Sequence, residues 1–327
     1  MTDHPLYVIG GRQREDRGLG DRKPGWYGYD VGVVLRVDPD GHVTTVKEFT
    51  SRPGACAEGD PVLLKCATRS GNRLYCCTQT EVVVFSLPDF EPVVYVSLPR
   101  FNDVHHVLPT DSGTMLVAIS GLEMVVEIDD DGNVLGEWNV LGGPAWNGFD
   151  PHVDYRQGVN TKPHRAHPNY LFQLDGRPWV TRFECKDAVA VADPRDRLEA
   201  AHERLHDGVV RGTDVYFTTV DGTIARYDTA QRRPVESHAL TRSSGHDDVL
   251  GWCRGLYFQD DDHCWVGFTR IRPTRLRETV AWIRNRGTSQ APTRIARYAT
   301  DGWTIVDEIE LERHGMNAVF SIVSAQS

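Results

Sequence analysis

Val33–Val43 reads VVLRVDPDGHV, an apolar strand pattern that runs into a polar turn and then into the start of a second strand. The unit returns at Val125–Val134 as VVEIDDDGNV, and weaker copies occupy residues 224–228 and 295–302. Runs of β-branched residues bounded by Asp, Pro and Gly are typical of antiparallel strands joined by tight turns. The recurrence of one such unit indicates a fold built from repeats.

A second pair of short strands is expected ahead of each later copy of this unit. The pairs fall at 62–69 with 73–78, 104–110 with 114–119, 168–174 with 178–183, 207–211 with 215–219, and 255–259 with 264–269. Each pair, together with the unit that follows it, makes a four-strand repeat of roughly 40–50 residues, which is the period of propeller blades.

The two ends of the chain supply one further repeat between them. Strands at 6–9, 33–37 and 43–49 lack an innermost partner, and a C-terminal strand at 317–323 has none. Pairing the two ends closes the ring and leaves no exposed sheet edge. We therefore predict an all-β fold, a single six-bladed β-propeller over residues 1–327, with the C-terminal strand closing the N-terminal blade. Five- or seven-bladed propellers, a large β-sandwich and two small β domains are the alternatives.

This repeat pattern, taken over the whole chain, resembles that of the six-bladed propeller superfamily that includes gluconolactonase-like and strictosidine-synthase-like proteins. The resemblance implies the architecture. The carboxylate and asparagine calcium ligands of those families have no clear counterpart in this sequence.

The composition is that of an ordinary globular protein, with 40% hydrophobic and 25% charged residues. The 46 acidic residues outnumber the 36 basic ones, and the net charge of −10 argues against a general nucleic-acid-binding role. No run reaches the roughly 18–20 consecutive apolar residues that span a bilayer, and the first residues lack the pattern of a signal peptide. Seven cysteines without a CxxC pair favour reduced, structural thiols. We expect a cytoplasmic protein that binds neither nucleic acid nor membrane.

Two stretches interrupt the repeat. Residues 141–166 form a long loop rich in glycine and aromatic residues, and loops of this length commonly cover a binding site. We expect a lid, with Trp146 and Phe149 packed on the bound molecule. Residues 270–291, inserted in the last blade, carry six arginines against one glutamate and read partly as a short helix. That excess suggests an anionic substrate, an acidic partner or a contact between copies in a homo-oligomer, with a solvated face as the alternative.

Histidines recur where the innermost strands begin. His105, His167 and His206 stand at the starts of three consecutive innermost strands, and Cys253 takes that place in the next. In a propeller these starts meet at one end of the central channel. We expect the three histidines, with His106 as the substitute for His105, to bind one divalent transition metal through neutral imidazoles.

Imidazole ligands suit iron, zinc and copper, and we place iron first among them. Three protein ligands leave an open position for water, dioxygen or substrate. Asp103 and Asp207 lie close to two of the histidines in sequence and are expected to orient their rings and take part in catalysis. His152 and His164 in the long loop are further candidates. Histidines that only hydrogen-bond neighbouring blades are the structural alternative.

Other residues near this mouth of the channel predict a cationic pocket with aromatic walls. Such a pocket suits a carboxylate or phosphate on an apolar body. Its expected members are Arg254, Arg182, Lys162, Arg165 and Trp252. Cys253, beside Arg254, is a candidate nucleophile, metal ligand or packed thiol. Buried arginines paired across blades with Asp or Glu are the structural alternative.

Two classes of function follow from these features. The first is a metal-dependent enzyme that acts on a small, anionic molecule by oxygenation or by metal-assisted lysis or hydrolysis. The second is a non-catalytic propeller scaffold that presents one face to a ligand or to another protein. The concentration of His, Arg, Trp and Asp at the starts of the innermost strands favours the enzyme.

Overall fold

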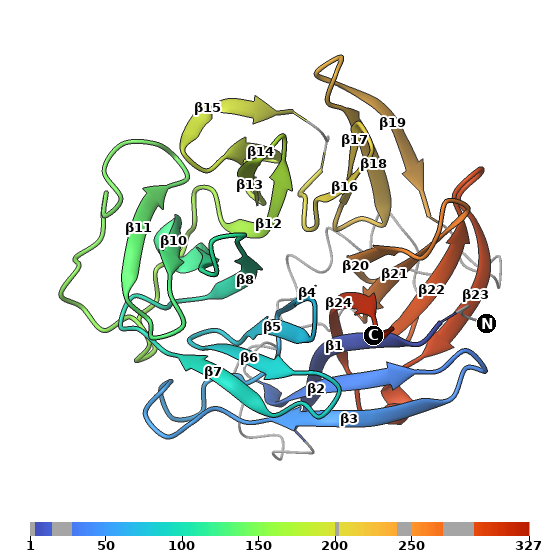
Figure 1. Ribbon diagram of the computed structural model, residues 1–327, viewed down its shortest axis with the longest axis horizontal. Coiled ribbons are helices and arrows are strands. Elements are labelled where there is room, and N and C mark those ends of the chain that lie inside the picture. The colour runs from blue at the N-terminus through green and yellow to red at the C-terminus, as the bar shows by residue number, and fades with distance from the viewer. Residues whose placement is uncertain (1–3, 15–27, 200–202, 241–249, 271–290, 327) are drawn as a thin grey trace.

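The computed structural model describes residues 4–14, 28–199, 203–240, 250–270 and 291–326. Its strands form six four-stranded antiparallel sheets, arranged in a ring as the blades of a propeller (Figure 1). The innermost strands of neighbouring blades contact one another around the central channel. Among the described residues, no helix is long and apolar enough to cross a membrane.

Each blade runs outward from an innermost strand beside the channel. From inside to outside, the first blade contains β24 (Ala318–Ser324), β1 (Leu6–Gln13), β2 (Tyr29–Val37) and β3 (Val43–Phe49). The second contains β4 (Cys66–Ser70), β5 (Arg73–Cys77), β6 (Val82–Ser86) and β7 (Pro92–Val96). The third contains β8 (Val104–Pro109), β9 (Met115–Ile119), β10 (Met124–Ile128) and β11 (Val134–Asn139).

The other three blades follow the same order. The fourth contains β12 (Pro168–Leu174), β13 (Arg177–Arg182), β14 (Asp187–Ala190) and β15 (Asp193–Leu198). The fifth contains β16 (Val209–Arg211), β17 (Asp214–Thr218), β18 (Thr223–Asp228) and β19 (Arg233–Ala239). The sixth contains β20 (Trp252–Phe258), β21 (His263–Thr269), β22 (Arg294–Ala299) and β23 (Thr304–Glu310). Two short 3₁₀ turns, η2 (Ser120–Leu122) and η3 (Glu312–His314), complete the described elements.

Alternation along the strands explains how the ring is held together. Side chains of β1 point alternately to its two faces, so Leu6 and Val8 pack against the sixth blade while Tyr7 and Ile9 pack against the second. The same arrangement gives an apolar cluster at every junction between neighbouring blades. The core is therefore a ring of six sheet-to-sheet interfaces, and each blade depends on both neighbours.

The predicted closure of the ring is confirmed. β24 pairs with β1 in antiparallel register from Leu6 with Ser324 to Gly11 with Ala318. Figure 1 shows the C-terminal strand lying between β1 and the channel. The single six-bladed propeller with a shared first blade is therefore the observed fold. The basic insertion and its short helix lie outside the described residues, apart from Arg270 and Ala291 at its two ends.

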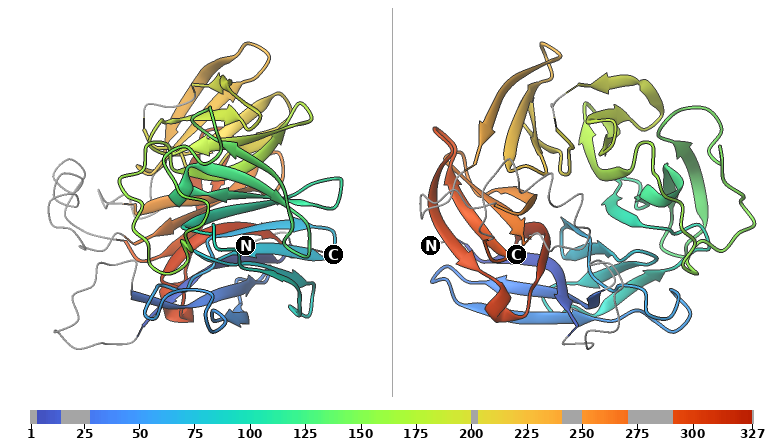
Figure 2. Two further views of the ribbon diagram at one scale, coloured as in Figure 1. Left: turned by 90° about the vertical axis from the view of Figure 1, so that its left-hand side faces the viewer. Right: turned by 180° about the vertical axis from the view of Figure 1, so that it is seen from behind.

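The innermost strands all run the same way along the channel, which gives the molecule two distinct mouths. We call the end where these strands begin the proximal mouth and the end where they finish the distal mouth. The C-terminus, at the end of β24, lies on the distal side (Figure 2). The predicted histidines belong to the proximal half of the channel.

Candidate metal centre

Three consecutive blades place a polar residue directly before their innermost strand. These residues are Lys65 before β4, Asp103 before β8 and His167 before β12. The Asp103 carbonyl accepts the N–H of Ser120 at 3.2 Å, and the His167 carbonyl accepts the N–H of Phe183 at 3.1 Å. Asp103 and His167 share a left-handed backbone, with φ of 54° and 56°. Non-glycine residues rarely adopt this conformation, and it is often found at functional sites.

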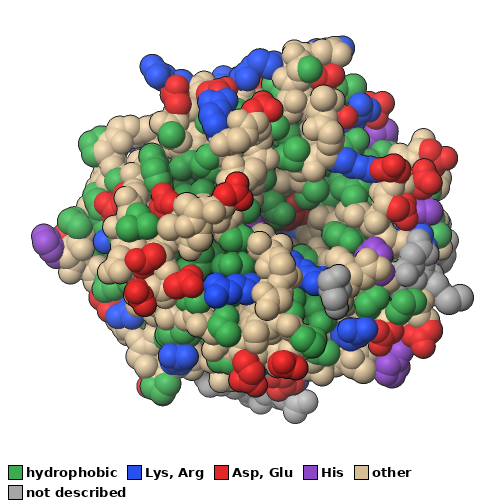
Figure 3. Space-filling view, viewed as in Figure 1, with side chains coloured by type: hydrophobic (Ala, Val, Ile, Leu, Met, Phe, Trp, Pro, Cys, Tyr) green, Lys and Arg blue, Asp and Glu red, His purple; other side chains and the backbone are tan. Residues whose placement is uncertain are grey.

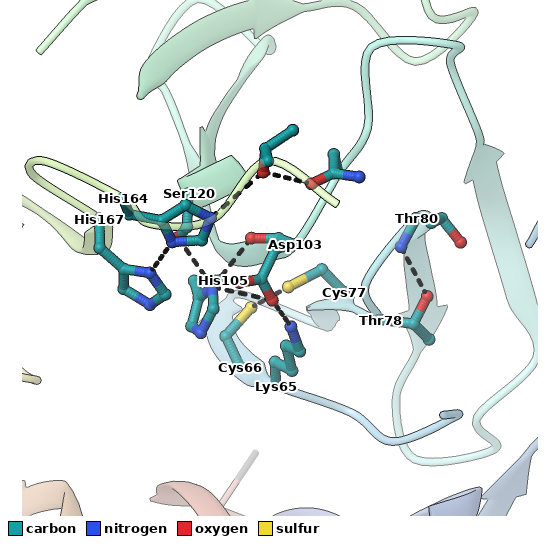
Figure 4. A network of polar contacts seen from close by, with 12 residues as sticks. Lys65, Cys66, Cys77, Thr78, Thr80, Asp103, His105, Ser120, His164 and His167 are labelled. Atoms are coloured by element: carbon teal, nitrogen blue, oxygen red, sulfur yellow. Dashed lines mark hydrogen bonds and ion pairs between the residues drawn. The ribbon is translucent and has the colours of Figure 1, made fainter. Parts of the chain in front are cut away.

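Asp103, His164 and His167 form a compact set of potential metal ligands. One side-chain ligand atom from each lies within 4.8 Å of the others. The Nδ1 atoms of His164 and His167 are hydrogen-bonded to each other at 2.5 Å, so a metal bound there would replace the proton that they share. The two rings are stacked with centroids 4.8 Å apart (Figure 4). Two ring nitrogens and a carboxylate therefore converge on one small volume at the proximal mouth.

A buried carboxylate fixes the end of the long loop that carries His164. Glu123 follows η2 and is 4% exposed. Its oxygens accept the backbone N–H groups of Arg165 at 2.5 Å, Ala166 at 3.0 Å and His167 at 2.8 Å. These three bonds hold the turn between His164 and β12, so both histidines are positioned by backbone anchoring.

The protonation states of the three groups suit a cation. Burial lowers the pKa of His164, and it lowers the pKa of His167 to about 3. Burial alone would raise the pKa of Asp103, but the charge and the hydrogen bond of Lys65 hold it well below its usual range. Near neutral pH the imidazoles are therefore neutral and the carboxylate is ionised. Metal ligation requires these forms of both groups.

Two further polar residues, Lys65 and His105, lie beside these three. The ring centroid of His105 is 4.7 Å from that of His167. Its Nδ1 lies 2.9 Å from the Asp103 carbonyl oxygen and 2.8 Å from Ser120 Oγ. The Ser120 hydroxyl donates to the Pro168 carbonyl, so the proton on His105 must be at Nδ1 and the Nε2 atom keeps its lone pair.

The sequence led us to expect His105 and His167 at equivalent strand starts, and the structure differs by two residues. The pairing of β8 with β9 skips from Val104 to His106, so His105 is the extra residue of a β-bulge. Bulges re-aim side chains and are frequent next to active sites. Asp103, not His105, occupies the position equivalent to His167.

His106 and His206 do not join this set. His106 lies against Tyr170, with ring centroids 4.1 Å apart and the ring planes at 44°. The His206 Nδ1 lies 3.0 Å from Asp207 Oδ1. Asp207 thus orients His206, as the sequence suggested, while Asp103 belongs to the other group. The predicted four-histidine set is divided into two places in the channel.

The predicted catalytic residues of the sixth blade are both buried. Cys253 is 1% exposed, and burial raises the pKa of its thiol well above the ordinary value. A protonated thiol in an apolar cluster is a poor nucleophile. Arg254 is 6% exposed and lies 4.2 Å from the Phe320 ring centroid and 5.9 Å from that of Trp252. It therefore contributes a buried positive charge beside His206.

Arg182 is a structural residue, but its carboxylate partner lies in its own blade and not in a neighbouring one as the sequence alternative had it. It donates to both oxygens of Asp187, at 2.8 and 2.5 Å, and to the Val140 carbonyl at 2.9 Å. Lys162 and Arg165 are exposed on the loop next to His164. Of these three cations, Lys162 is the one whose charge acts on the candidate ligands, His164 and His167.

The long loop is packed against the protein over much of its length. Trp146 and Phe149 lie against the apolar cluster between the second and third blades. The Trp146 indole N–H donates to Glu137 at 3.2 Å. Contact of these two rings with a ligand stays a prediction, and the loop residue that reaches the candidate ligands is His164.

Lys65 is the main residue of the centre that sequence reasoning missed. It is 4% exposed and forms an ion pair with Asp103 Oδ1 (Figure 4). A signal was present, because Lys65 directly precedes an innermost strand as Asp103 and His167 do. The search for histidines alone passed over it.

Stability is expected to fall between pH 7 and pH 5, because His106 stays neutral in the folded protein. Burial lowers its pKa to about 3, against 6.5 for an ordinary histidine. Between these values the unfolded chain binds a proton that the folded chain does not, so acidification favours unfolding, by about 2 kcal/mol over this interval. The free energy of unfolding in urea should be measured at pH 7 and at pH 5 for both metal-free proteins. Between these pH values the wild type should lose about 2 kcal/mol more of it than the His106→Gln variant. Equal losses in the two proteins would contradict the prediction.

No protein-family model and no curated protein sequence matches the chain. Among solved structures it is similar to a protein of unknown function from Bacteroides caccae, with 12% identity over 97% of this chain and 98% of that chain and a TM-score of 0.59. A virginiamycin B lyase from Staphylococcus aureus has 13% identity over 72% of this chain and 69% of its own, with a TM-score of 0.45. A streptogramin B lyase has 12% identity over 94% and 88%, with a TM-score of 0.48. Identities this low establish the shared fold alone.

Proposed function

We propose that the chain is a metal-dependent enzyme whose divalent transition metal is bound by Asp103, His164 and His167 at the proximal mouth. The convergence of these three ligand atoms within 4.8 Å carries the proposal. The neutral state of both imidazoles and the ionised state of the carboxylate support it. The Lys65 ion pair is compatible with it, because a carboxylate can accept on both oxygens.

The donor set bears on the choice of metal. Two histidines and one carboxylate with open positions are the ligands of many non-haem iron(II) oxygenases. Iron is therefore the metal we expect first, with zinc and copper as alternatives. Oxygenation, or lysis or hydrolysis assisted by the metal, is the corresponding chemistry.

The charges around the centre favour an anionic substrate. The principal charged groups that act on the five channel histidines balance one another: Lys65, Lys162 and Arg254 against Asp103, Glu123 and Asp207. A divalent ion would leave the region with an excess of about two positive charges, by simple addition. Small molecules with a carboxylate or phosphate group are therefore the expected substrates.

Metal analysis of protein purified without an affinity tag tests the proposal. We expect one transition-metal ion per chain in the wild type. Asp103→Asn, His164→Ala and His167→Ala should each reduce the metal content at least about tenfold, because even residues that only orient a ligand contribute that much. His152→Ala is the matched control, since His152 lies exposed in the same loop and should leave the content unchanged. Wild-type protein without metal would overturn the proposal and favour the scaffold.

A further inference from the structure

A second polar place in the channel has buried hydrogen-bonding groups without partners. His106 is 2% exposed and His206 is 6% exposed. Neither nitrogen of His106 has a hydrogen-bond partner among the described residues, and the same holds for Nε2 of His206. Buried polar side chains are nearly always hydrogen-bonded, so each such exception calls for an occupant such as a ligand, an ion or water.

His206 is held by a buried carboxylate that already has three hydrogen-bond partners. Asp207 is 1% exposed, and its Oδ1 lies 3.0 Å from Nδ1 of His206. Its Oδ2 accepts the Thr218 hydroxyl at 2.9 Å and the Leu256 N–H at 3.1 Å. Because Asp207 Oδ1 accepts from Nδ1 of His206, that ring is the Nδ1–H tautomer and its unpartnered Nε2 is an acceptor. The group that binds there must donate a hydrogen bond.

His106 adds a complementary requirement. It lies close enough to His206 and Asp207 for their charges to act on it, and burial keeps its ring neutral. A neutral imidazole has one N–H donor and one acceptor nitrogen. An occupant between the two rings should therefore donate to His206 and accept from His106. A hydroxyl group does both with one oxygen atom, whereas a carboxylate or a methyl group does not.

Two buried cations and a pocket lie near the two histidines. Arg254 and Lys65 are both buried, and both charges act on His206. A pocket of about 450 Å³ at the distal mouth is lined by Tyr170 and Leu256, which contact His106 and Asp207 respectively. Figure 3 views the molecule from this end, and the face is hollowed near its centre. The pair thus lies between the proposed metal centre and a second opening of the channel.

We propose that His106 and His206 form a binding site for the hydroxyl group of a small hydroxylated anion, with the anionic group held by the field of Arg254 and Lys65. Naming this ligand as the substrate rests on the proposed function. Binding at the two histidines does not, because neither residue belongs to the proposed metal ligands.

Three small probes separate the features of such a ligand. Glycolate carries both the hydroxyl and the negative charge, acetate lacks the hydroxyl, and glycolamide lacks the charge. Each is titrated into metal-free, ¹⁵N-histidine-labelled protein while long-range ¹H–¹⁵N spectra of the imidazoles are recorded. Loss of signals in His106→Gln and His206→Gln assigns the two rings.

We expect glycolate to shift the His206 Nε2 and His106 signals in a saturable manner below about 50 mM, which is a weak affinity for so small a probe. Acetate should bind at least about tenfold more weakly because it leaves the buried His206 Nε2 without a donor. Glycolamide should bind more weakly by a similar factor because it lacks the attraction to the buried cations. His206→Gln should lose glycolate binding, and His152→Gln should retain it.

Equal affinity for glycolate and acetate would overturn the assignment of the hydroxyl, and equal affinity for glycolamide would overturn that of the anion. Signals that do not respond at 100 mM glycolate would mean that water alone occupies the site, and the proposal would fall. Because the titration uses metal-free protein, that failure is distinct from a failure of the metal analysis.

Discussion

A chain that ends at Gly315 is expected to lose its cooperative fold. The truncation removes β24, whose Ala318, Val319 and Phe320 are at most 1% exposed and which supplies the innermost strand of the first blade. It would expose the edge of β1 and open the contacts of β24 with β4 and β20. Since every blade packs on both neighbours, opening one junction weakens the entire ring. Thermal unfolding followed by circular dichroism should show no cooperative transition at the wild-type temperature.

A single substitution tests the same closure without removing β24 from the chain. A Cβ atom on Gly10 would lie 1.8 Å from the Ala318 carbonyl oxygen, so Gly10→Ala cannot be accommodated without moving β24 away from β1. We expect a loss of about 3 kcal/mol or more, at the upper end of overpacking effects. Gly302→Ala, where the nearest atom would be 3.8 Å away, is the control. A Gly315 truncation that melts like the full chain would refute the closure.

Asp187→Ala should destabilise the protein by about 3–5 kcal/mol, the cost of leaving a buried charge without its partner. The Arg182 and Asp187 side chains are only 9% and 5% exposed and bind each other through two hydrogen bonds. Removing the carboxylate leaves the guanidinium with the Val140 carbonyl as its remaining described partner. Urea unfolding at pH 7 measures the difference.

The same blade contains a matched control for this pair. Asp193 and Arg195 form an ion pair in which the arginine side chain is 91% exposed. Asp193→Ala should therefore have little effect on stability, because water screens an exposed ion pair. The double variant Arg182→Met/Asp187→Leu should recover most of the stability lost in Asp187→Ala, because it buries no charge. A similar loss in Asp187→Ala and Asp193→Ala would contradict a structural role for the buried pair.

The blades could be predicted from the sequence because strand periodicity and turn residues are local signals that recur six times. The missing inner strand of the first blade even predicted the pairing of residues 6–9 with 317–323, which β1 and β24 confirm. Several strand boundaries differed by a few residues, and one has a clear physical reason. The expected strand at 62–69 begins at Cys66, because the preceding segment bonds to the first blade instead, with the Leu64 N–H donating to the Gly10 carbonyl.

The site was less accessible to sequence reasoning, for two physical reasons. A β-bulge has no clear sequence signature, so the register at the start of β8, where His105 is the extra residue, could not be predicted from the sequence. The position of His164 depends on the backbone anchoring of the loop by Glu123, a contact across more than 40 residues of chain. The sequence showed which types of residue lie near the strand starts. Which of these residues come together in the centre depends on the long-range contacts.

The location of the metal is the most direct test of the account. Crystals of the protein with its native metal, measured on both sides of the absorption edge of that element, give the position of the ion from its anomalous scattering. We predict one strong peak bounded by the carboxylate of Asp103 and the Nδ1 atoms of His164 and His167. A peak between His106 and His206, or no peak beside Asp103 in protein that contains the metal stoichiometrically, would contradict the proposed centre.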